Sequence, residues 1–494
     1  MTKLWANIKV LEYLGFVIVL AIASATRLWN LGFPQKLVFD ETYYVKDALS
    51  LSQEGNEKNW PEGANAVFES GDVYSYLADP AFVVHPPLGK WLIASGMWLL
   101  GPDNAVGWRI STALLGIATV ALLMLVAYKL FRSTKLALAA GFLLAIDGMA
   151  ITMSRTALLD APLTFFLLLG FLFFLIDNDQ SRLRIGYAIQ QGRTTLLWFR
   201  PWLVLAGVAL GAASAIKWSG LYLLAAIGLY VVFSELQLRR VSKEKSWVRS
   251  GLLAQGVISF LNLVPVAAAT YLSSWLGWIN SSGGYSRNWA EDNSLPGIFG
   301  ALPSWAQSLW NYHEVIYKFH VNLSEDHSYQ SHPITWLLGL RPTAFFYETY
   351  SAGQMGCEID TCSSAITALG NPLIWVFATA ALLYLAYRYL RTRERVIGLV
   401  LLGVGALYLP WLLIPDRTVF QFYAVSFLPW MILGLVLVMQ ILYRAIGNTK
   451  LAKTLVIGFF VLATLVSIFF LPVNIGLVVP YEQWQLRMWL PSWI

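Results

Sequence analysis

The chain has few charged residues, few histidines and only two cysteines. Of its 494 residues, 13% are Asp, Glu, Lys or Arg and 57% are hydrophobic, which excludes an ordinary soluble globular protein of this length. The formal net charge of +6 comes from basic residues in short, separate loops, so a nucleic-acid-binding surface is not expected. Four of the five histidines lie between 313 and 332, but they follow no zinc-ligand spacing, so no metal site is expected.

Apolar runs long enough to cross a bilayer account for most of the chain. About eleven such runs occur, at 8–27, 105–131, 135–153, 158–176, 201–217, 219–235, 250–276, 372–390, 394–414, 420–444 and 452–473. The first run is too long in its apolar part for a cleavable signal, so we interpret it as a signal anchor. The shorter run 88–100 carries Lys90 and is expected to be interfacial. The pattern predicts an all-α polytopic membrane protein with one membrane domain, 1–494.

The distribution of Lys and Arg predicts the orientation. If the N-terminus is cytoplasmic, the inner loops and the N-terminal stretch hold 21 of the 34 Lys and Arg residues. The opposite orientation would place every short basic loop outside, against the positive-inside tendency. The C-terminus and two large segments, 28–104 and 277–371, are therefore predicted to be external.

An acid pair, Asp40-Glu41, follows the first span at the start of the first external segment. Two interpretations are open. The pair can begin a helix over 42–50 as N-terminal capping residues. It can also carry out proton transfer on a substrate whose other half is a lipid, since acids at a membrane boundary are costly and usually functional. In the second external segment, Cys357 and Cys362 are spaced for a disulfide that staples a loop.

Four cations fall at the outer ends of separate predicted spans: Arg109, Arg155, Lys217 and Arg417. Individually they can pair with acids such as Asp147, Asp160 and Asp416, or extend to lipid headgroups. As a set they favour an anionic ligand, best a lipid phosphate, because Arg and Lys bind phosphate oxygens well. In that interpretation Asp147 and Asp160 orient the cations.

Two polar external motifs accompany these charges. His85-Pro-Pro-Leu-Gly-Lys90 leads into the interfacial run, and His85 is either a ligand or proton carrier or a structural hydrogen-bonding residue. The run from His327 to His332 is expected to contact substrate or to fix its loop.

The ordered motifs resemble those of the protein O-mannosyltransferase family of GT-C glycosyltransferases, in its bacterial, actinobacteria-like branch. The matching segments span nearly the whole chain: Thr26-Arg27, Phe39-Asp40-Glu41-Thr42, His85 to Lys90, Arg109, Leu159-Asp160, Lys217-Trp218-Ser219-Gly220, His327 to Glu348 with Gly339-Leu-Arg341-Pro342, and the ending Arg487 to Ile494. The resemblance implies transfer of mannose from a polyprenyl-phosphate carrier to Ser or Thr hydroxyls of exported proteins, with inversion. The exported proteins can receive the sugar during their translocation. The resemblance implies no cofactor.

The resemblance also assigns roles to residues. Asp40 matches the proposed catalytic base and Glu41 the adjacent essential acid, while Arg27 and Arg109 match required basic positions. We expect Arg109, Arg155, Lys217 and Arg417 to bind the donor phosphate. The expected supporting residues are Arg27, His85, Lys90, Asp160, Trp218, His327, His332, Arg341 and Tyr423. The plasma membrane is the expected location, with the active site outside.

The chain departs from eukaryotic members in two places. The 95 residues of 277–371 are too few for their inserted β-trefoil (MIR) domain, and Leu159-Asp160 continues as Ala-Pro instead of Ser-Met. The alternatives are a GT-C transferase acting on a glycan or lipid acceptor and, less favoured, a lipid or sugar transporter, which would need polar residues through the membrane midplane. An oligosaccharyltransferase is not favoured because a Trp-Trp-Asp motif and a large soluble C-terminal domain are absent from the sequence.

Overall fold

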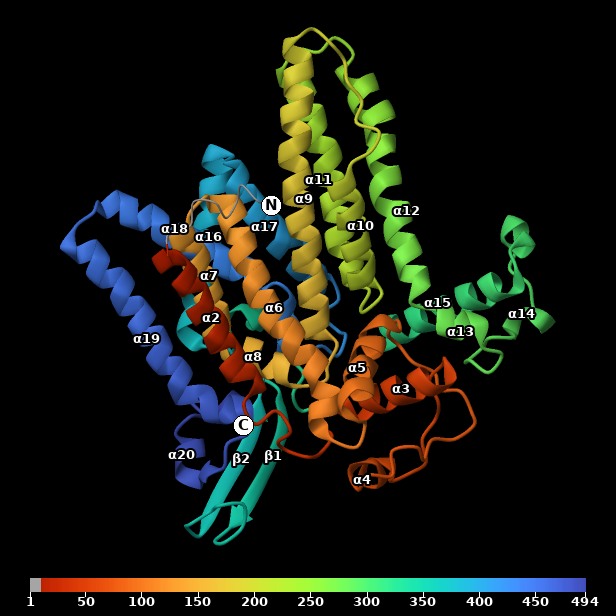
Figure 1. Ribbon diagram of the computed structural model, residues 1–494, viewed down its shortest axis with the longest axis vertical. Helices are drawn as coiled ribbons and strands as arrows, with labels where there is room; N and C mark the ends of the chain where they lie inside the picture. The colour runs from red at the N-terminus through yellow and green to blue at the C-terminus, as the bar shows by residue number, and fades with distance from the viewer. Residues whose placement is uncertain (1–9) are drawn as a thin grey trace.

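The computed structural model describes residues 10–494 and shows a bundle of long helices standing on a layer of shorter elements (Figure 1). The first half of the chain forms α2 (Val10–Leu28), α3 (Glu41–Glu54), α4 (Ala64–Glu69), α5 (Leu88–Leu100), α6 (Ala105–Phe131), α7 (Thr134–Ile146), α8 (Gly148–Arg155), α9 (Asp160–Gln190), α10 (Pro201–Ser214), α11 (Gly220–Val241), the π-helical η1 (Arg249–Gly256) and α12 (Val257–Ser273). Helices α3, α4 and α5 lie at the lower edge of the bundle in Figure 1.

The second half repeats this division between short and long elements. The segment after α12 forms α13 (Leu276–Asn280), α14 (Trp289–Asp292), η2 (Gly297–Ala301), α15 (Ser304–Asn322), η3 (Pro333–Leu338), β1 (Ala344–Ser351) and β2 (Thr361–Thr367). The chain ends with α16 (Pro372–Thr392), α17 (Arg395–Tyr408), η4 (Leu409–Leu413), η5 (Gln421–Ser426), α18 (Leu428–Ile446), α19 (Lys450–Ile475), β3 (Val479–Pro480), α20 (Tyr481–Gln485) and η6 (Pro491–Trp493).

The prediction of a polytopic helical membrane protein is confirmed. Within residues 10–494, nine helices are long and apolar enough to span a membrane, or ten if the bent pair α7–α8 is one span. The predicted run 201–217 forms the 14-residue α10, about 21 Å long and short of the roughly 20 residues a full span needs. Eleven spans are reached only if α10 is also counted.

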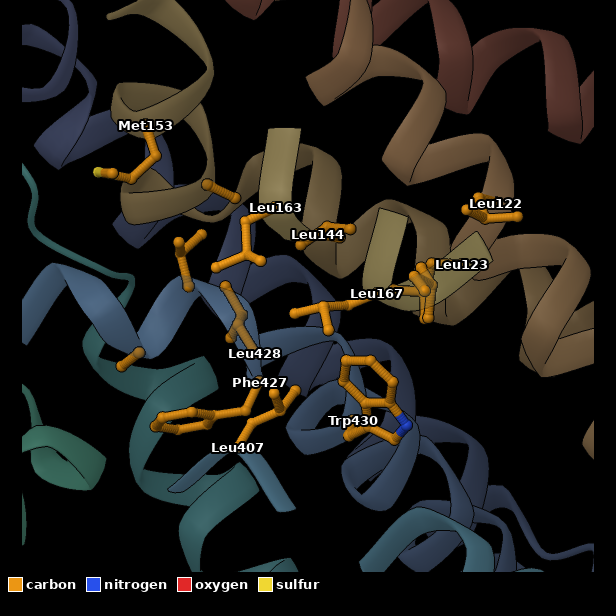
Figure 2. Packing of buried hydrophobic residues seen from close by; sticks show 14 of the residues in the cluster. Leu122, Leu123, Leu144, Met153, Leu163, Leu167, Leu407, Phe427, Leu428 and Trp430 are labelled. Atoms are coloured by element: carbon orange, nitrogen blue, oxygen red, sulfur yellow. The ribbon is translucent and has the colours of Figure 1, made fainter. Parts of the chain in front are cut away.

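Helices α6, α9 and α18 form the centre of the bundle. In α9, 67% of the apolar window is buried inside the protein, against 11% in the peripheral α19. Figure 2 shows part of the buried hydrophobic cluster, with Leu122 and Leu123 of α6, Leu163 and Leu167 of α9, and Leu428 and Trp430 of α18. This packing holds α6 and α9 together, and the N-terminal turns of these helices carry Arg109 and Asp160.

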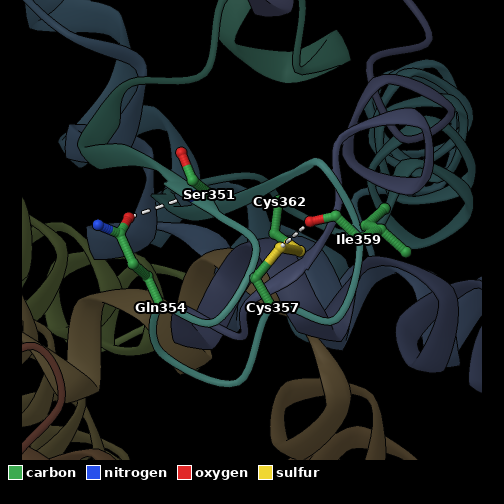
Figure 3. The surroundings of a disulfide bond; sticks show 5 residues. All are labelled: Ser351, Gln354, Cys357, Ile359 and Cys362. Carbon is green, nitrogen blue, oxygen red and sulfur yellow. Dashed lines mark hydrogen bonds between the residues drawn. A yellow bond between two sulfur atoms is a disulfide. The ribbon is translucent and has the colours of Figure 1, made fainter.

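A small antiparallel sheet in the order β1-β2-β3 adds strands to the predicted all-α fold. Strands β1 and β2 form a hairpin in which Tyr350 lies opposite Cys362. The disulfide Cys357–Cys362 closes the loop at its tip, with the Ser351 amide donating to Gln354 (Figure 3). The hairpin and the C-terminus lie at the same end of the molecule as α3–α5, and the 190–200 loop lies at the opposite end (Figure 1).

Candidate active site

A cavity of about 700 Å³ opens where the ends of several helices meet. Its wall comes from the start of α9, the turn before α11, the end of α15 and the segment from η4 to η5. The polar lining residues are His85, Asp160, Lys217, Trp218, Ser219, Tyr222, Tyr317, His320, Asn322, Ser324, Trp411, Asp416, Arg417, Tyr423 and Ser426. The apolar ones, including Leu163, Leu413 and Ile414, give the cavity an amphipathic character that suits a lipid-linked polar group.

Lys217 and Asp160 form a buried ion pair at one wall. The Lys217 ammonium lies 2.7 Å from an Asp160 carboxylate oxygen and 4.9 Å from the centre of the Tyr423 ring. Asp160 is the first residue of α9, where a carboxylate is stabilised by the positive end of the helix dipole. The pair leaves this wall close to neutral while still offering ammonium protons to a ligand.

Asp40 lies next to this pair at the start of α3. It occupies the position before the helix, but its side chain makes no capping hydrogen bond and instead accepts one from Tyr44. Burial raises the pKa of the Asp40 carboxyl to about 6, although the nearby Lys217 charge opposes the rise. A carboxyl with this pKa is mostly ionised at neutral pH and can accept a proton.

The neighbouring acid has a different environment. Glu41 is fully buried and receives both Nε (2.9 Å) and Nη2 (2.8 Å) of Arg109, together with the backbone amides of Val38 and Ala157. The remaining Arg109 donors go to the carbonyls of residues 31, 34 and 36. The structure therefore does not bring Arg109 or Glu41 to the cavity, and the pair instead ties α3 to α6.

Arg155 and Arg27 also bind the chain itself. Arg155 donates hydrogen bonds to the carbonyls of residues 26, 27, 29 and 30, so these backbone oxygens at the C-terminal end of α2 have partners. Arg27 donates to the carbonyls of Leu144 (3.1 Å) and Ala145 (3.0 Å) at the end of α7. Asp147 accepts from the Ala150 and Asn371 amides and the Trp375 indole, so it caps α8 and forms no ion pair with these cations.

Arg417 is the predicted phosphate-binding cation that does reach the cavity without a carboxylate partner within residues 10–494. Its Nε donates to the His320 carbonyl (3.1 Å), and its Nη2 lies 3.0 Å from His320 Nδ1. His85 also lines the cavity, stacked on the His320 ring at 5.3 Å. Burial lowers the pKa of His85 well below its usual value, so this ring stays neutral.

Two supporting residues, Lys90 and Trp218, hold parts of the cavity wall in place. Lys90 is buried, forms an ion pair with Glu57 and donates to the His85 carbonyl (3.2 Å), so it holds the loop that carries His85. The Trp218 indole donates to the Tyr271 hydroxyl (3.1 Å), which lies 2.6 Å from His313 Nε2. This chain of hydrogen bonds fixes the indole against the cavity.

The remaining predicted residues lie outside the cavity lining. His332 caps η3 by accepting from the Ile334 amide, and exposed His327 packs against Phe420 at 4.9 Å. Arg341 donates to the carbonyls of Ser492 and Ile494 and so holds the C-terminal tail. Within residues 10–494, we find no group of three His, Cys, Asp or Glu side chains that could hold a metal ion.

Sequence reasoning missed Tyr44, Glu57, Tyr271, His313 and His320. His313 and His320 are seven residues apart, so an expected helix over this stretch would have placed them on one face. Tyr44, Tyr271 and Glu57 carry no comparable signal because their partners are distant in the sequence.

Comparison with known proteins decides the family. The family model described as dolichyl-phosphate-mannose-protein mannosyltransferase matches residues 86–276, and the model of the C-terminal four-helix region of protein-O-mannosyltransferase matches 305–493. The chain belongs to the protein O-mannosyltransferase family.

The relatives extend over almost the whole chain. A polyprenol-phosphate-mannose–protein mannosyltransferase of Mycolicibacterium smegmatis is 33% identical over 96% of this chain and 92% of its own length. One from Corynebacterium glutamicum is 31% identical over 100% and 93%. The Saccharomyces cerevisiae protein O-mannosyltransferase Pmt1-Pmt2 complex, solved with the sugar donor, has the same fold, with a TM-score of 0.75, 16% identity and coverage of 100% of this chain and 94% of that one.

Proposed function

We propose that this protein transfers mannose from polyprenyl-phosphate-mannose to Ser or Thr hydroxyls of exported proteins, with inversion at the anomeric carbon. The observation that carries the proposal is the near full-length similarity to bacterial proteins with that named activity. The amphipathic cavity supports it, because one side offers Lys217 and Arg417 for a phosphate and Asp40 lies beside it.

In the proposed reaction, the acceptor hydroxyl oxygen attacks the anomeric carbon from the face opposite the phosphate. The bond between that carbon and the phosphate oxygen breaks, and polyprenyl phosphate leaves with the electron pair. Asp40 accepts the hydroxyl proton. Arg417 and Lys217 stabilise the charge that develops on the phosphate in a site partly shielded from water.

The other predicted residues take positioning roles in this proposal. Glu41 and Arg109 fix the start of α3 and hence Asp40, while Lys90 fixes the His85 loop. Arg27 and Arg155 hold the outer helix ends together. His327, His332 and Arg341 shape the external surface over which an acceptor would pass.

The remaining proposals concern setting and cofactors. The cytoplasmic N-terminus, external active site and plasma-membrane location rest on the basic inner loops. No cofactor is proposed, because protein cations supply the charge that a metal would otherwise bring. Transfer is accordingly expected to persist after treatment with a chelator, measured as labelled product with and without added magnesium or manganese.

The deciding experiment mixes purified protein, labelled polyprenyl-phosphate-mannose and a Ser/Thr/Pro-rich peptide. We expect alkali-labile label on the peptide, and a loss of at least about a hundredfold in Asp40→Asn with donor binding retained. Label on a free glycan or lipid instead of the peptide would assign the protein to the alternative transferase class. Unchanged transfer by Asp40→Asn would remove Asp40 as the base but leave the reaction in place.

A further inference from the structure

The hydrogen-bond directions around His320 fix its protonation state. A guanidinium N–H can only donate, so His320 Nδ1, 3.0 Å from Arg417 Nη2, must be an acceptor. A carbonyl oxygen can only accept, so Nε2, 2.9 Å from the Val84 oxygen, must carry the proton. His320 is therefore the neutral Nε2–H tautomer, with both ring nitrogens engaged.

This one residue holds one edge of Arg417 at two points. Its backbone carbonyl accepts from Arg417 Nε, and its ring accepts from Nη2. The Arg417 guanidinium also lies over the Trp411 ring at 5.6 Å. Within residues 10–494, Nη1 has no protein acceptor, so this side of the fork is available to a ligand in the cavity.

The charge balance of the cavity points to Arg417 as the cation for phosphate. The Lys217 charge is already matched by Asp160 at 2.7 Å, whereas Arg417 has no carboxylate within ion-pair distance in the described chain. An uncompensated guanidinium in an amphipathic cavity is best satisfied by an anion such as a phosphate monoester or diester.

We propose that His320 is a positioning residue that aims Arg417 at the donor phosphate and holds the loop carrying His85 against the same wall. The hold depends on an unprotonated Nδ1, since an imidazolium would repel the guanidinium. The burial of the ring and the nearby Arg417 charge lower the pKa of His320 to about 4, which keeps this nitrogen free. The inference rests on the proposed function, because it names the residue that orders the phosphate end of the donor.

The test measures binding of polyprenyl phosphate, which carries no sugar, to the full-length protein in detergent. We expect His320→Leu to weaken binding by about tenfold, the size of one charge-assisted hydrogen bond. We expect His320→Asn to stay within about threefold of wild type, because its amide oxygen takes the place of Nδ1. Lys318→Gln, which removes an exposed positive charge from the same helix, is the matched control and should bind normally.

A double-mutant cycle separates positioning from general damage. If His320 acts through Arg417, adding His320→Leu to Arg417→Gln causes no further loss of binding, while independent effects would multiply. Multiplying losses, or wild-type binding by His320→Leu or by Arg417→Gln, would overturn the proposal. If His320→Leu unfolds on heating far below wild type, the Asn variant carries the test, and a tenfold loss in that variant overturns the proposal.

The same proteins are then assayed for mannose transfer to peptide. If His320 and Arg417 are coupled in lipid-phosphate binding but the wild type transfers no mannose, the His320 inference stands and the protein-mannosylation proposal is rejected. If the wild type transfers mannose but His320 and Arg417 are not coupled in binding, the protein-mannosylation proposal stands and the His320 inference is rejected.

Discussion

At the scale of single residues, two adjacent carboxylates have opposite environments. The Asp40 carboxyl lies beside Lys217 and Asp160, accepts a hydrogen bond from Tyr44, and has its pKa raised to about 6 by burial. Glu41 has no exposed surface and is fully used by Arg109 and two backbone amides. Chemistry is therefore expected to depend on the first acid and folding on the second.

The raised pKa of Asp40 predicts an acid limb in the rate of transfer. The groups that face Asp40 are Lys217, Asp160 and Tyr44. A base works only when ionised, so kcat/KM should fall as pH drops below about 6, by about tenfold per unit. The measurement is transfer at limiting donor between pH 4.5 and 8 with folding checked at each pH, and a rate that stays flat down to pH 5 would contradict the role of Asp40.

Removal of the Glu41 charge is expected to destabilise the protein. Glu41→Gln leaves the Arg109 guanidinium buried without a counter-ion, which costs about 3–5 kcal/mol in comparable pairs. The readout is the melting temperature in detergent. The control is Glu314→Gln, which breaks the exposed pair with Lys318 and should leave the melting temperature unchanged; equal effects of both variants would refute a structural role for Glu41.

At the scale of elements, the backbone groups at buried helix ends form hydrogen bonds with polar side chains of other helices. Arg155 of α8 satisfies the end of α2, and Arg27 of α2 satisfies the end of α7. Asp147 separates α7 from α8, which are bent by 62°, and it accepts three N–H groups. Backbone groups freed inside an apolar bundle need such partners.

Asp147→Ala should therefore weaken the junction between α7, α8 and the start of α16. Three buried donors lose their acceptor, so we expect a loss of at least about 2 kcal/mol of stability. Thr449→Ala is the matched control, because Thr449 caps α19 at an exposed site through a single bond to the Ala452 amide. Melting temperatures decide the outcome, and an Asp147 variant no less stable than the Thr449 variant would contradict this account.

At the scale of the whole molecule, the long helices separate the polar segments into two ends. The β1–β2 hairpin and the C-terminus lie at one end, and the basic loop before α10 lies at the other (Figure 1). If the proposed function holds, we expect the donor, the acceptor and the proposed base to meet on one side of the membrane.

Orientation can be tested with single cysteines in intact cells. Asp72 and Lys243 are exposed and lie in segments predicted to be external and cytoplasmic. A membrane-impermeant maleimide should label Asp72→Cys but not Lys243→Cys, and both after permeabilisation. The native cysteines are joined in a disulfide and contribute no background. The opposite labelling pattern would invert the proposed topology.

The sequence by itself determined the membrane class, the positions of the apolar segments and the family, because these depend on local hydropathy and on the order of short motifs. It also predicted that Asp40, Lys217 and Arg417 lie at the ends of separate spans on one side of the membrane. It did not distinguish Asp40 from Glu41, nor the cations that line the cavity from those that cap helices. Only the tertiary structure decided these roles, because the partner of Glu41 is 68 residues away and that of Arg417 is 97 residues away.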